Sequence, residues 1–127
     1  MCRACREAPL LTIAKRAVPP DVVVLEITGR ITIGRDCQEV EWEVDRLLAE
    51  RTSKVVFDLS HVSHMDSTGI GIVVLCSGKL KAAGGGLRIS GATGLVDKVL
   101  RMTSVDNIVP LDGTPEESVR GLSAAAS

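Results

Sequence analysis

Two nearly continuous apolar runs, VVVLEIT (residues 22–28) and KVVFDLS (residues 54–60), most constrain what this chain can fold into. Runs with little polar alternation are typical of strands that are covered on both faces, as in parallel sheets. Between them, residues 37–50 (CQEVEWEVDRLLAE) have the periodicity of a helix. Its apolar residues recur on one face: Cys37, Val40, Val44, Leu47 and Leu48. The pattern therefore predicts a strand–helix–strand unit with parallel strands.

The rest of the chain continues the alternation. Residues 10–18 (LLTIAKRAV) are predicted to be a strand that turns at Pro19–Asp21 into the strand after it. Three more helices and two more strands are predicted, at residues 67–83 (helix), 87–90 (strand), 95–103 (helix), 107–111 (strand) and 115–125 (helix). We expect Gly29 to end the second strand, Asp36 to cap the first helix, and residues 61–66 to form a loop.

This order predicts an α/β protein with a mixed β-sheet of four to five strands packed with about four α-helices. The first two strands can form an antiparallel hairpin, and helices separate the later strands. The 127 residues suffice for one domain with a core, expected at residues 9–122. Residues 1–8 and 123–127 are expected to be disordered tails.

Composition argues against several functions. The net charge is −1, there is no basic stripe, and one Trp, one Phe and no Tyr leave little for base stacking, so no nucleic-acid partner is expected. No run approaches the roughly 20 apolar residues that span a bilayer, and the N-terminus does not resemble a secretory signal. We therefore expect a cytoplasmic protein whose four cysteines are reduced thiols.

The segment HMDSTGIGIVV (residues 64–74) places an acid, two hydroxyls and two glycines where a helix is predicted to begin. A nucleophile elbow would need glycine two residues before Ser67, where Met65 stands. No phosphate-binding loop motif is present, because Gly69 and Gly71 are only a fragment of one. We expect no catalytic group and no cofactor here.

Two residue pairs have spacings familiar from zinc sites: Cys2 with Cys5, and His61 with His64. The cysteines lie on the predicted tail, and neither pair has a further ligand in the pattern. The Cys2–Cys5 pair also neither follows a strand nor opens a helix, as a redox motif would. We expect no metal site.

Asp66 or Ser67 can cap the following helix, which stabilises a helix by about 1 kcal/mol. A cap does not explain Gly69 and Gly71, since each glycine costs about 1 kcal/mol relative to alanine inside a helix. Close approach of another backbone or of a protein partner would explain them. A phosphate on an exposed hydroxyl at this helix start would be favoured by the helix dipole and could repel such a partner.

Trp42 lies almost opposite the apolar face of its predicted helix, among Glu39, Asp45 and Arg46. The ring could simply cover the aliphatic stems of surface side chains. It could also contact a protein partner, since Trp is enriched at the centres of interfaces. The sequence leaves both interpretations open.

The segment VVFDLSHVSHMDSTGIGIVV (residues 55–74), followed by a helix, a glycine break, LRISG and another helix, resembles the STAS domain. More narrowly, it is similar to bacterial anti-sigma factor antagonists. Their signature is a strand ending in Asp-Leu and then Asp-Ser-Ser/Thr-Gly-Leu/Ile-Gly. Here these are Asp58-Leu59 and residues 66–71, and the resemblance extends over about residues 10–122.

The resemblance implies a protein switch without enzymatic activity. The unmodified form would bind an anti-sigma factor that is also a serine kinase, and so release a sigma factor for transcription. Phosphorylation at Ser67 would end that binding, with Thr68 as the second choice of acceptor, and a phosphatase of the PP2C type would reverse it. The partner-binding residues are then expected to be Asp66, Ser67, Thr68, Gly69, Ile70, Gly71, Thr32 and Trp42.

One position departs from the family pattern. Antagonists commonly have an acid three residues after the glycine that follows the second strand, and this chain has Thr32 there, with Asp36 four residues on. The resemblance also extends to STAS domains that are stressosome scaffolds or subunits of transport complexes. A scaffold of that kind, without direct sigma control, is the alternative function.

Overall fold

The computed structural model describes residues 11–19, 21–32 and 35–125. Its five-stranded sheet has the spatial order β1 (Leu11–Val18), β2 (Val22–Ile31), β3 (Lys54–Met65), β4 (Gly86–Ser90) and β5 (Leu111–Asp112). β1 is antiparallel to β2, and every other neighbouring pair is parallel. The predicted mixed α/β sheet is confirmed. Cys2 and Cys5 lie outside the described residues.

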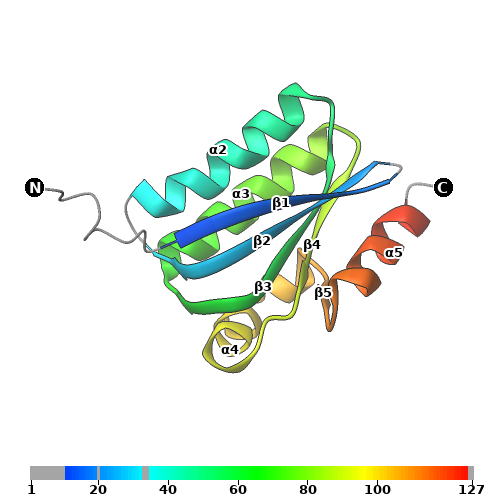
Figure 1. Ribbon diagram of the computed structural model, residues 1–127. Coiled ribbons are helices and arrows are strands. Elements are labelled where there is room, and N and C mark those ends of the chain that lie inside the picture. The colour runs from blue at the N-terminus through cyan, green and yellow to red at the C-terminus, as the bar shows by residue number, and fades with distance from the viewer. Residues whose placement is uncertain (1–10, 20, 33–34, 126–127) are drawn as a thin grey trace, which may run out of the picture.

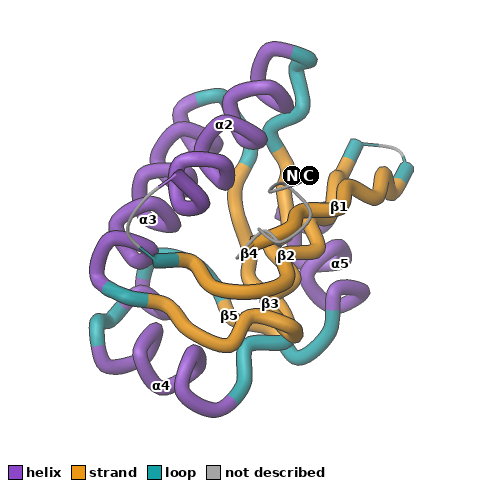
Figure 2. Tube along the Cα trace, turned by 60° about the vertical axis from the view of Figure 1, so that its left-hand side comes forward, coloured by secondary structure: helices purple, strands orange, loops and turns teal. Residues whose placement is uncertain are grey.

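Three helices lie on one face of the sheet and one on the other (Figures 1 and 2). α2 (Arg35–Ala49), α3 (Ser67–Ala82) and α4 (Gly94–Met102) each join two parallel neighbours, and each step moves the same way across the sheet. Right-handed crossovers therefore place all three on the same face. A short 3₁₀ turn, η1 (Val105–Asn107), follows α4, and α5 (Pro115–Ala125) follows the last strand and packs on the opposite face.

The two faces have separate hydrophobic clusters. The larger one lies under α2, α3 and α4 and includes Leu25, Phe57 and Ile89, all fully buried. The smaller one consists of Val22, Val24, Val56 and Leu122, with Val18 and Val119 packed against it. Burial on both faces explains the continuous apolar runs of β2 and β3.

β2 and β3 are both longer than predicted. β2 continues past Gly29 to Ile31, and β3 continues through residues 61–65, which were expected to form a loop. The pairing accommodates this with two register shifts, each leaving one extra residue on β3, and Gly29 has a positive φ of 117° beside one of them. Val62 and Met65, three residues apart, therefore both belong to the larger cluster, whereas a regular strand would turn them to opposite faces.

Two smaller expectations were wrong. The predicted strand at 107–111 is reduced to Leu111–Asp112, because residues 105–107 form η1. α2 begins at Arg35, so Asp36 lies in its first turn rather than before it, and the Asp36 side chain is outside the described residues. The helix predicted at residues 115–125 is confirmed as α5.

A polar cluster attaches α5 to the sheet. Arg88 Nε donates a hydrogen bond to Asp112 Oδ2 at 2.8 Å, and Ser118 Oγ donates to the same oxygen at 2.7 Å. The hydrogen bond from Arg88, with that from Ser118, lowers the pKa of Asp112 despite its partial burial. β4, β5 and α5 are thus joined through one carboxylate.

Candidate functional site

Asp66 joins the end of β3 to the start of α3. Its backbone is extended (φ −104°, ψ −174°), and its Oδ1 accepts a hydrogen bond from the backbone N–H of Gly69 at 2.9 Å. An N-cap carboxylate satisfies one of the amides that a helix start leaves without a partner, and it interacts favourably with the helix dipole. Of the two candidate caps, Asp66 is therefore the cap, and Ser67 is the first residue of the helix.

The start of α3 is packed directly against the end of β2. The backbone N–H of Asp66 donates to the carbonyl of Ile31 at 3.4 Å. A Cβ atom built on Gly69 would lie only 2.2 Å from that carbonyl oxygen, so the position admits no side chain. The close approach at Gly69 is thus made by the chain's own backbone, the first of the two explanations considered from the sequence. The expected contribution of Gly69 to partner binding stays a prediction.

Ser67 and Thr68 are both exposed. Among the described residues, neither side-chain hydroxyl makes a hydrogen bond. Both stand in the first turn of α3, where free amides and the helix dipole favour a negative group. The site therefore offers two accessible hydroxyls at a place that can accommodate a phosphate.

Ile70 and Gly71 extend this surface along α3. Ile70 is half-buried, and Gly71 is exposed with no atom within 4 Å of a Cβ built on it. One turn further along α3, Leu75 is 43% exposed. In contrast to Gly69, no contact within the described part of the chain requires a glycine at position 71, and this glycine leaves the helix surface flat beside an exposed leucine.

Thr32 lies at the same edge as the acceptor loop. It directly follows Ile31, which pairs with Met65 and accepts the hydrogen bond from Asp66. The structure thus brings Thr32 beside Asp66, although the two are far apart in sequence. The position at which the resemblance leads us to expect an acid therefore lies beside the loop, and its side chain here is uncharged.

Trp42 lies on the outer side of α2 with 46% of its surface exposed. It lines a shallow hollow of about 100 Å³ with Glu39, Glu43 and Arg46, all from the same helix. The ring therefore lies among polar side chains of its own helix, and the structure does not bring it together with Ser67. Its role in partner binding stays a prediction.

Cys37 lies beneath the acceptor loop, which the sequence pattern did not reveal. Burial raises the pKa of the Cys37 thiol, and the nearby negative charges of Asp66 and Glu41 add to the effect. Burial likewise raises the pKa of the Cys76 thiol to about 12. Both thiols therefore stay protonated and are poor nucleophiles at neutral pH.

Both histidines are exposed residues of β3, and the ring of each is hydrogen-bonded to the hydroxyl of the serine before it. Ser60 Oγ lies 3.2 Å from His61 Nδ1, and Ser63 Oγ lies 2.8 Å from His64 Nδ1. Within residues 11–19, 21–32 and 35–125, no group of three His, Cys, Asp or Glu side chains is arranged to hold a metal ion. Nor is any helix in this part of the chain long and apolar enough to cross a membrane.

Fold and site together define a small α/β domain that presents accessible hydroxyls where a strand meets a capped helix. Residues 14–118 match the family model of the STAS domain. The chain therefore belongs to the STAS domain family.

Several known proteins are similar to this chain. A Thermotoga maritima protein, named provisionally as an anti-sigma factor antagonist, is 27% identical over 99 residues, which cover 78% of this chain and 88% of that protein. A crystal structure with the same provisional name, from the same organism, has a TM-score of 0.79 at 25% identity and covers 87% of this chain and 93% of the other.

Three further solved structures share the fold at lower identity. The anti-sigma factor antagonist SpoIIAA, in its unphosphorylated form, has a TM-score of 0.70 at 20% identity, covering 89% of this chain and 97% of SpoIIAA. SpoIIAA from Bacillus has also been solved in its phosphorylated form. A sulfate transporter family protein from Wolinella succinogenes has a TM-score of 0.66 at 17% identity, covering 87% of this chain and 88% of the other.

Proposed function

We propose that this protein is an anti-sigma factor antagonist that is switched by phosphorylation of Ser67. In the unmodified state it binds an anti-sigma factor with serine kinase activity, and the sigma factor is released. The observation that carries the proposal is the exposed Ser67 hydroxyl, unengaged within the described residues, on a helix start capped by Asp66. The similarity to named antagonists supports the same function.

The chemistry is a phosphoryl transfer for which the partner supplies the catalytic groups. Ser67 Oγ attacks the γ-phosphorus of ATP, the bond to the β–γ bridging oxygen breaks, ADP leaves, and the serine proton passes to a base of the kinase. A PP2C-type phosphatase reverses this by hydrolysing the serine ester with water. On this chain, capping by Asp66 holds the first turn of α3 in place while the hydroxyl remains accessible.

Phosphorylation would change the surface without requiring the fold to change. The phosphate adds about −1.5 to −2 charges next to Asp66, in the first turn of α3. The helix dipole partly compensates this charge. A partner that covers Ser67, Gly71 and Leu75 would have to bury that charge against an apolar surface, so its affinity would fall.

Thr32 bears on how efficiently the kinase recognises the loop. It lies beside Asp66 at the position where the resemblance leads us to expect an acid. We expect Thr32→Asp to increase the rate of Ser67 phosphorylation by the cognate kinase, and Thr32→Asn, of similar size but neutral, to leave it close to the wild-type rate. The measurement is the initial rate of phosphate incorporation.

The test of the function compares variants of the acceptor. Tagged wild type, Ser67→Ala and Ser67→Asp are used to capture partners from a lysate of the native host, and bound proteins are identified by mass spectrometry. We expect wild type and Ser67→Ala to retain an anti-sigma factor kinase and Ser67→Asp to lose it. Thr114→Asp is the matched control and should bind like the wild type, because it adds the same charge at the start of α5 on the other face, where an aspartate can also accept the backbone N–H of Glu117.

The alternative is a STAS scaffold or transport-complex subunit, which the shared fold with a sulfate transporter family protein and the neutral Thr32 favour. In that case all variants at Ser67 would retain the same partners, with stressosome or transport components among them. Equal retention by Ser67→Ala and Ser67→Asp would reject the phosphorylation switch. Incubating the wild type with the captured kinase and ATP then shows whether a phosphate is added at residue 67 or 68.

A further inference from the structure

The face of the sheet opposite α3 is only half covered. α5 packs over β2, β3 and β4, whereas on β1 the side chains of Thr12, Ala14 and Arg16 remain exposed. These residues alternate along β1 with Ile13 and Lys15, and Lys15 reaches Glu43 of α2 on the other face. Two hollows lie on this uncovered half, and neither belongs to the acceptor site.

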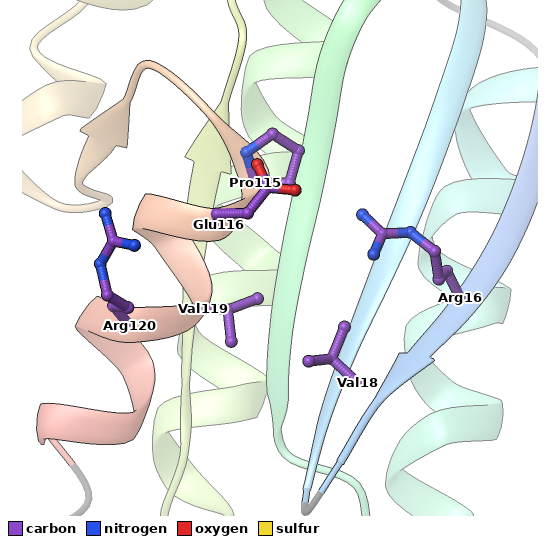
Figure 3. Close-up of a pocket in the computed structure, with 6 residues that line it drawn as sticks. All are labelled: Arg16, Val18, Pro115, Glu116, Val119 and Arg120. Atoms are coloured by element: carbon purple, nitrogen blue, oxygen red, sulfur yellow. The ribbon is translucent and has the colours of Figure 1, made fainter.

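The first hollow is apolar at its centre and lies between β1 and α5. It has a volume of about 170 Å³ and is lined by Val18, Val119 and Pro115, with Arg16, Glu116 and Arg120 around it. Figure 3 shows Val18 and Val119 facing each other across it, while Arg16 extends from β1 toward Pro115 and Glu116. The hollow exposes the edge of the smaller hydrophobic cluster.

The second hollow lies further along the same strands and is acidic. It has a volume of about 340 Å³ and is lined by Glu26, Asp58, Thr12, Thr28 and His61, with Ile13 and Ala14 at its side. Glu26 and Asp58 are direct register partners on β2 and β3. Like charges placed side by side on a sheet repel each other.

Of this acidic pair, only Glu26 has a cationic partner among the described residues. Arg16 Nε donates to Glu26 Oε2 at 3.2 Å, and it therefore links the two hollows. Asp58 Oδ1 accepts only the backbone N–H of Ser60 at 3.1 Å, and no cationic side chain among the described residues pairs with it. A cation that enters the second hollow would satisfy Asp58 and relieve the repulsion.

We propose that this half-face is a docking surface for a segment of a partner protein that carries an apolar side chain and a basic side chain. The apolar side chain fills the hollow between Val18 and Val119, and the lysine or arginine lies between Glu26 and Asp58. Val18 and Ala14, which mark the two hollows on β1, are four residues apart, or about 13 Å along a strand. An extended segment spans this distance when its two anchoring side chains are also four residues apart.

The surface is independent of Ser67, because α3 and the acceptor loop belong to the opposite side of the sheet. A partner can therefore be held here while an anti-sigma factor is bound or released at the acceptor site. Ser67→Asp should leave docking unchanged, so failure of one proposal does not imply failure of the other.

The test uses the full chain labelled with ¹⁵N and a pentapeptide probe, acetyl-Leu-Thr-Ala-Thr-Arg-amide. Its leucine and arginine have the required spacing in an extended conformation. We expect saturable shifts in the amide signals of Thr12, Ala14, Glu26 and Asp58. The matched control peptide, with glutamate in place of the arginine, should produce none, because Glu26 and Asp58 repel it.

Variants then assign the contacts. Asp58→Asn should weaken binding about tenfold, as expected for loss of one charge-assisted interaction. Glu26→Gln provides a second, independent variant, and Asp106→Asn, on η1, removes a charge elsewhere and should bind like the wild type. The dispersion of each variant's own spectrum shows that it is folded.

Three results would overturn the proposal. The first is the absence of saturable shifts with the arginine peptide, and the second is equal binding of the glutamate peptide. The third is equal binding of arginine amide alone, which would show that the hollow at Val18 and Val119 contributes nothing and that the site takes a small cation rather than a protein segment.

Discussion

The two faces of the sheet use the same strands but are covered in different ways. On one face, three crossover helices bury large side chains such as Leu25, Phe57 and Ile89 completely. On the other, one helix covers a smaller cluster made mainly of valines and is attached through the polar cluster at Asp112. The handedness of parallel connections dictates the first arrangement, whereas the second depends on a single C-terminal helix. The proposed phosphate acceptor is thus on the face that three helices cover, and the proposed docking surface is on the part of the other face that α5 leaves uncovered.

The largest difference is expected for one substitution made on both faces. Leu25 is 0% exposed under the three helices, and Leu122 is 5% exposed under α5. We expect Leu25→Ala to reduce the free energy of unfolding by about 4 kcal/mol and Leu122→Ala by about 2 kcal/mol, because α5 can move inward more easily to fill the cavity. Urea unfolding measures both. Equal losses would show that the two faces are equally well packed.

Two glycines test how tightly each layer of helices approaches the sheet. A Cβ on Gly69 would meet the Ile31 carbonyl oxygen, which is backbone, whereas one on Gly121 of α5 would meet the guanidinium of Arg88, which can move. We expect Gly69→Ala to destabilise the protein by about 2–3 kcal/mol and Gly121→Ala by less than about 1 kcal/mol.

Gly71→Ala is the control for helix propensity in this series. Nothing lies within 4 Å of a Cβ at Gly71, so alanine there should stabilise the protein by about 1 kcal/mol. Thermal unfolding of the three variants gives the comparison. If Gly69→Ala were stabilising as well, the contact between α3 and β2 would be looser than the structure indicates.

The polar attachment of α5 should depend on pH. The hydrogen bonds from Arg88 and Ser118 lower the pKa of Asp112 below its ordinary value of 3.8. A lowered folded-state pKa contributes stability that is present above the unfolded value and is lost as the pH falls through the folded value. We expect Asp112→Asn to lower the free energy of unfolding by about 1.5–3 kcal/mol at neutral pH, because it weakens a charge-assisted hydrogen-bond network. The difference in the free energy of unfolding between this variant and the wild type should shrink below about pH 3.8.

Denaturant unfolding of wild type and Asp112→Asn across pH 7 to pH 3 measures this effect. A difference that stays constant down to the acid end would show that Asp112 acts through shape rather than charge. Protease sensitivity of α5 would be a second readout, since release of this helix alone exposes the smaller cluster.

The smallest effect is expected at the polar contact between α2 and α3. Lys79 Nζ lies 2.8 Å from both Glu41 Oε2 and Asp45 Oδ1, and its side chain is 30% exposed. Hydrogen bonds with Asp45 and Glu41 raise the pKa of Lys79, so its contribution is fully present at neutral pH and is lost only as the solution becomes strongly alkaline. We expect Lys79→Met to lower the free energy of unfolding by less than about 1 kcal/mol, and by the same amount at pH 6 and pH 9. A larger loss in chemical denaturation would indicate that the pair is better shielded from water than its exposure suggests.

The sequence predicted most of the fold because apolar periodicity determines where strands and helices occur. The helices at 67–82 and 115–125 and the capping by Asp66 or Ser67 followed from local patterns alone. The extension of β3 did not, because a bulge allows Val62 and Met65 to be buried on the same face at a spacing that matches no regular strand. Local rules cannot anticipate such irregular pairing.

The sequence motif identified the candidate site residues, but it did not predict the contacts that they make with the rest of the fold. The motif located Ser67 at the helix start, yet the reason for Gly69 is a carbonyl on another strand, which only the fold brings close. The resemblance grouped Thr32 with the residues of the loop, and the pairing of Ile31 with Met65 places it beside them, while its role in recognition stays a prediction. The hollows on the second face could not be predicted, because they depend on how far α5 extends across the sheet.

The exposed position of Trp42 makes this protein its own optical reporter. It is the single Trp in a chain without Tyr, so ultraviolet emission arises almost entirely from the outer surface of α2. A partner that touches only the start of α3 would leave the emission spectrum unchanged. One that also covers α2 would remove water from the indole and shift the emission to shorter wavelengths, so an unlabelled titration can outline how far a bound protein reaches.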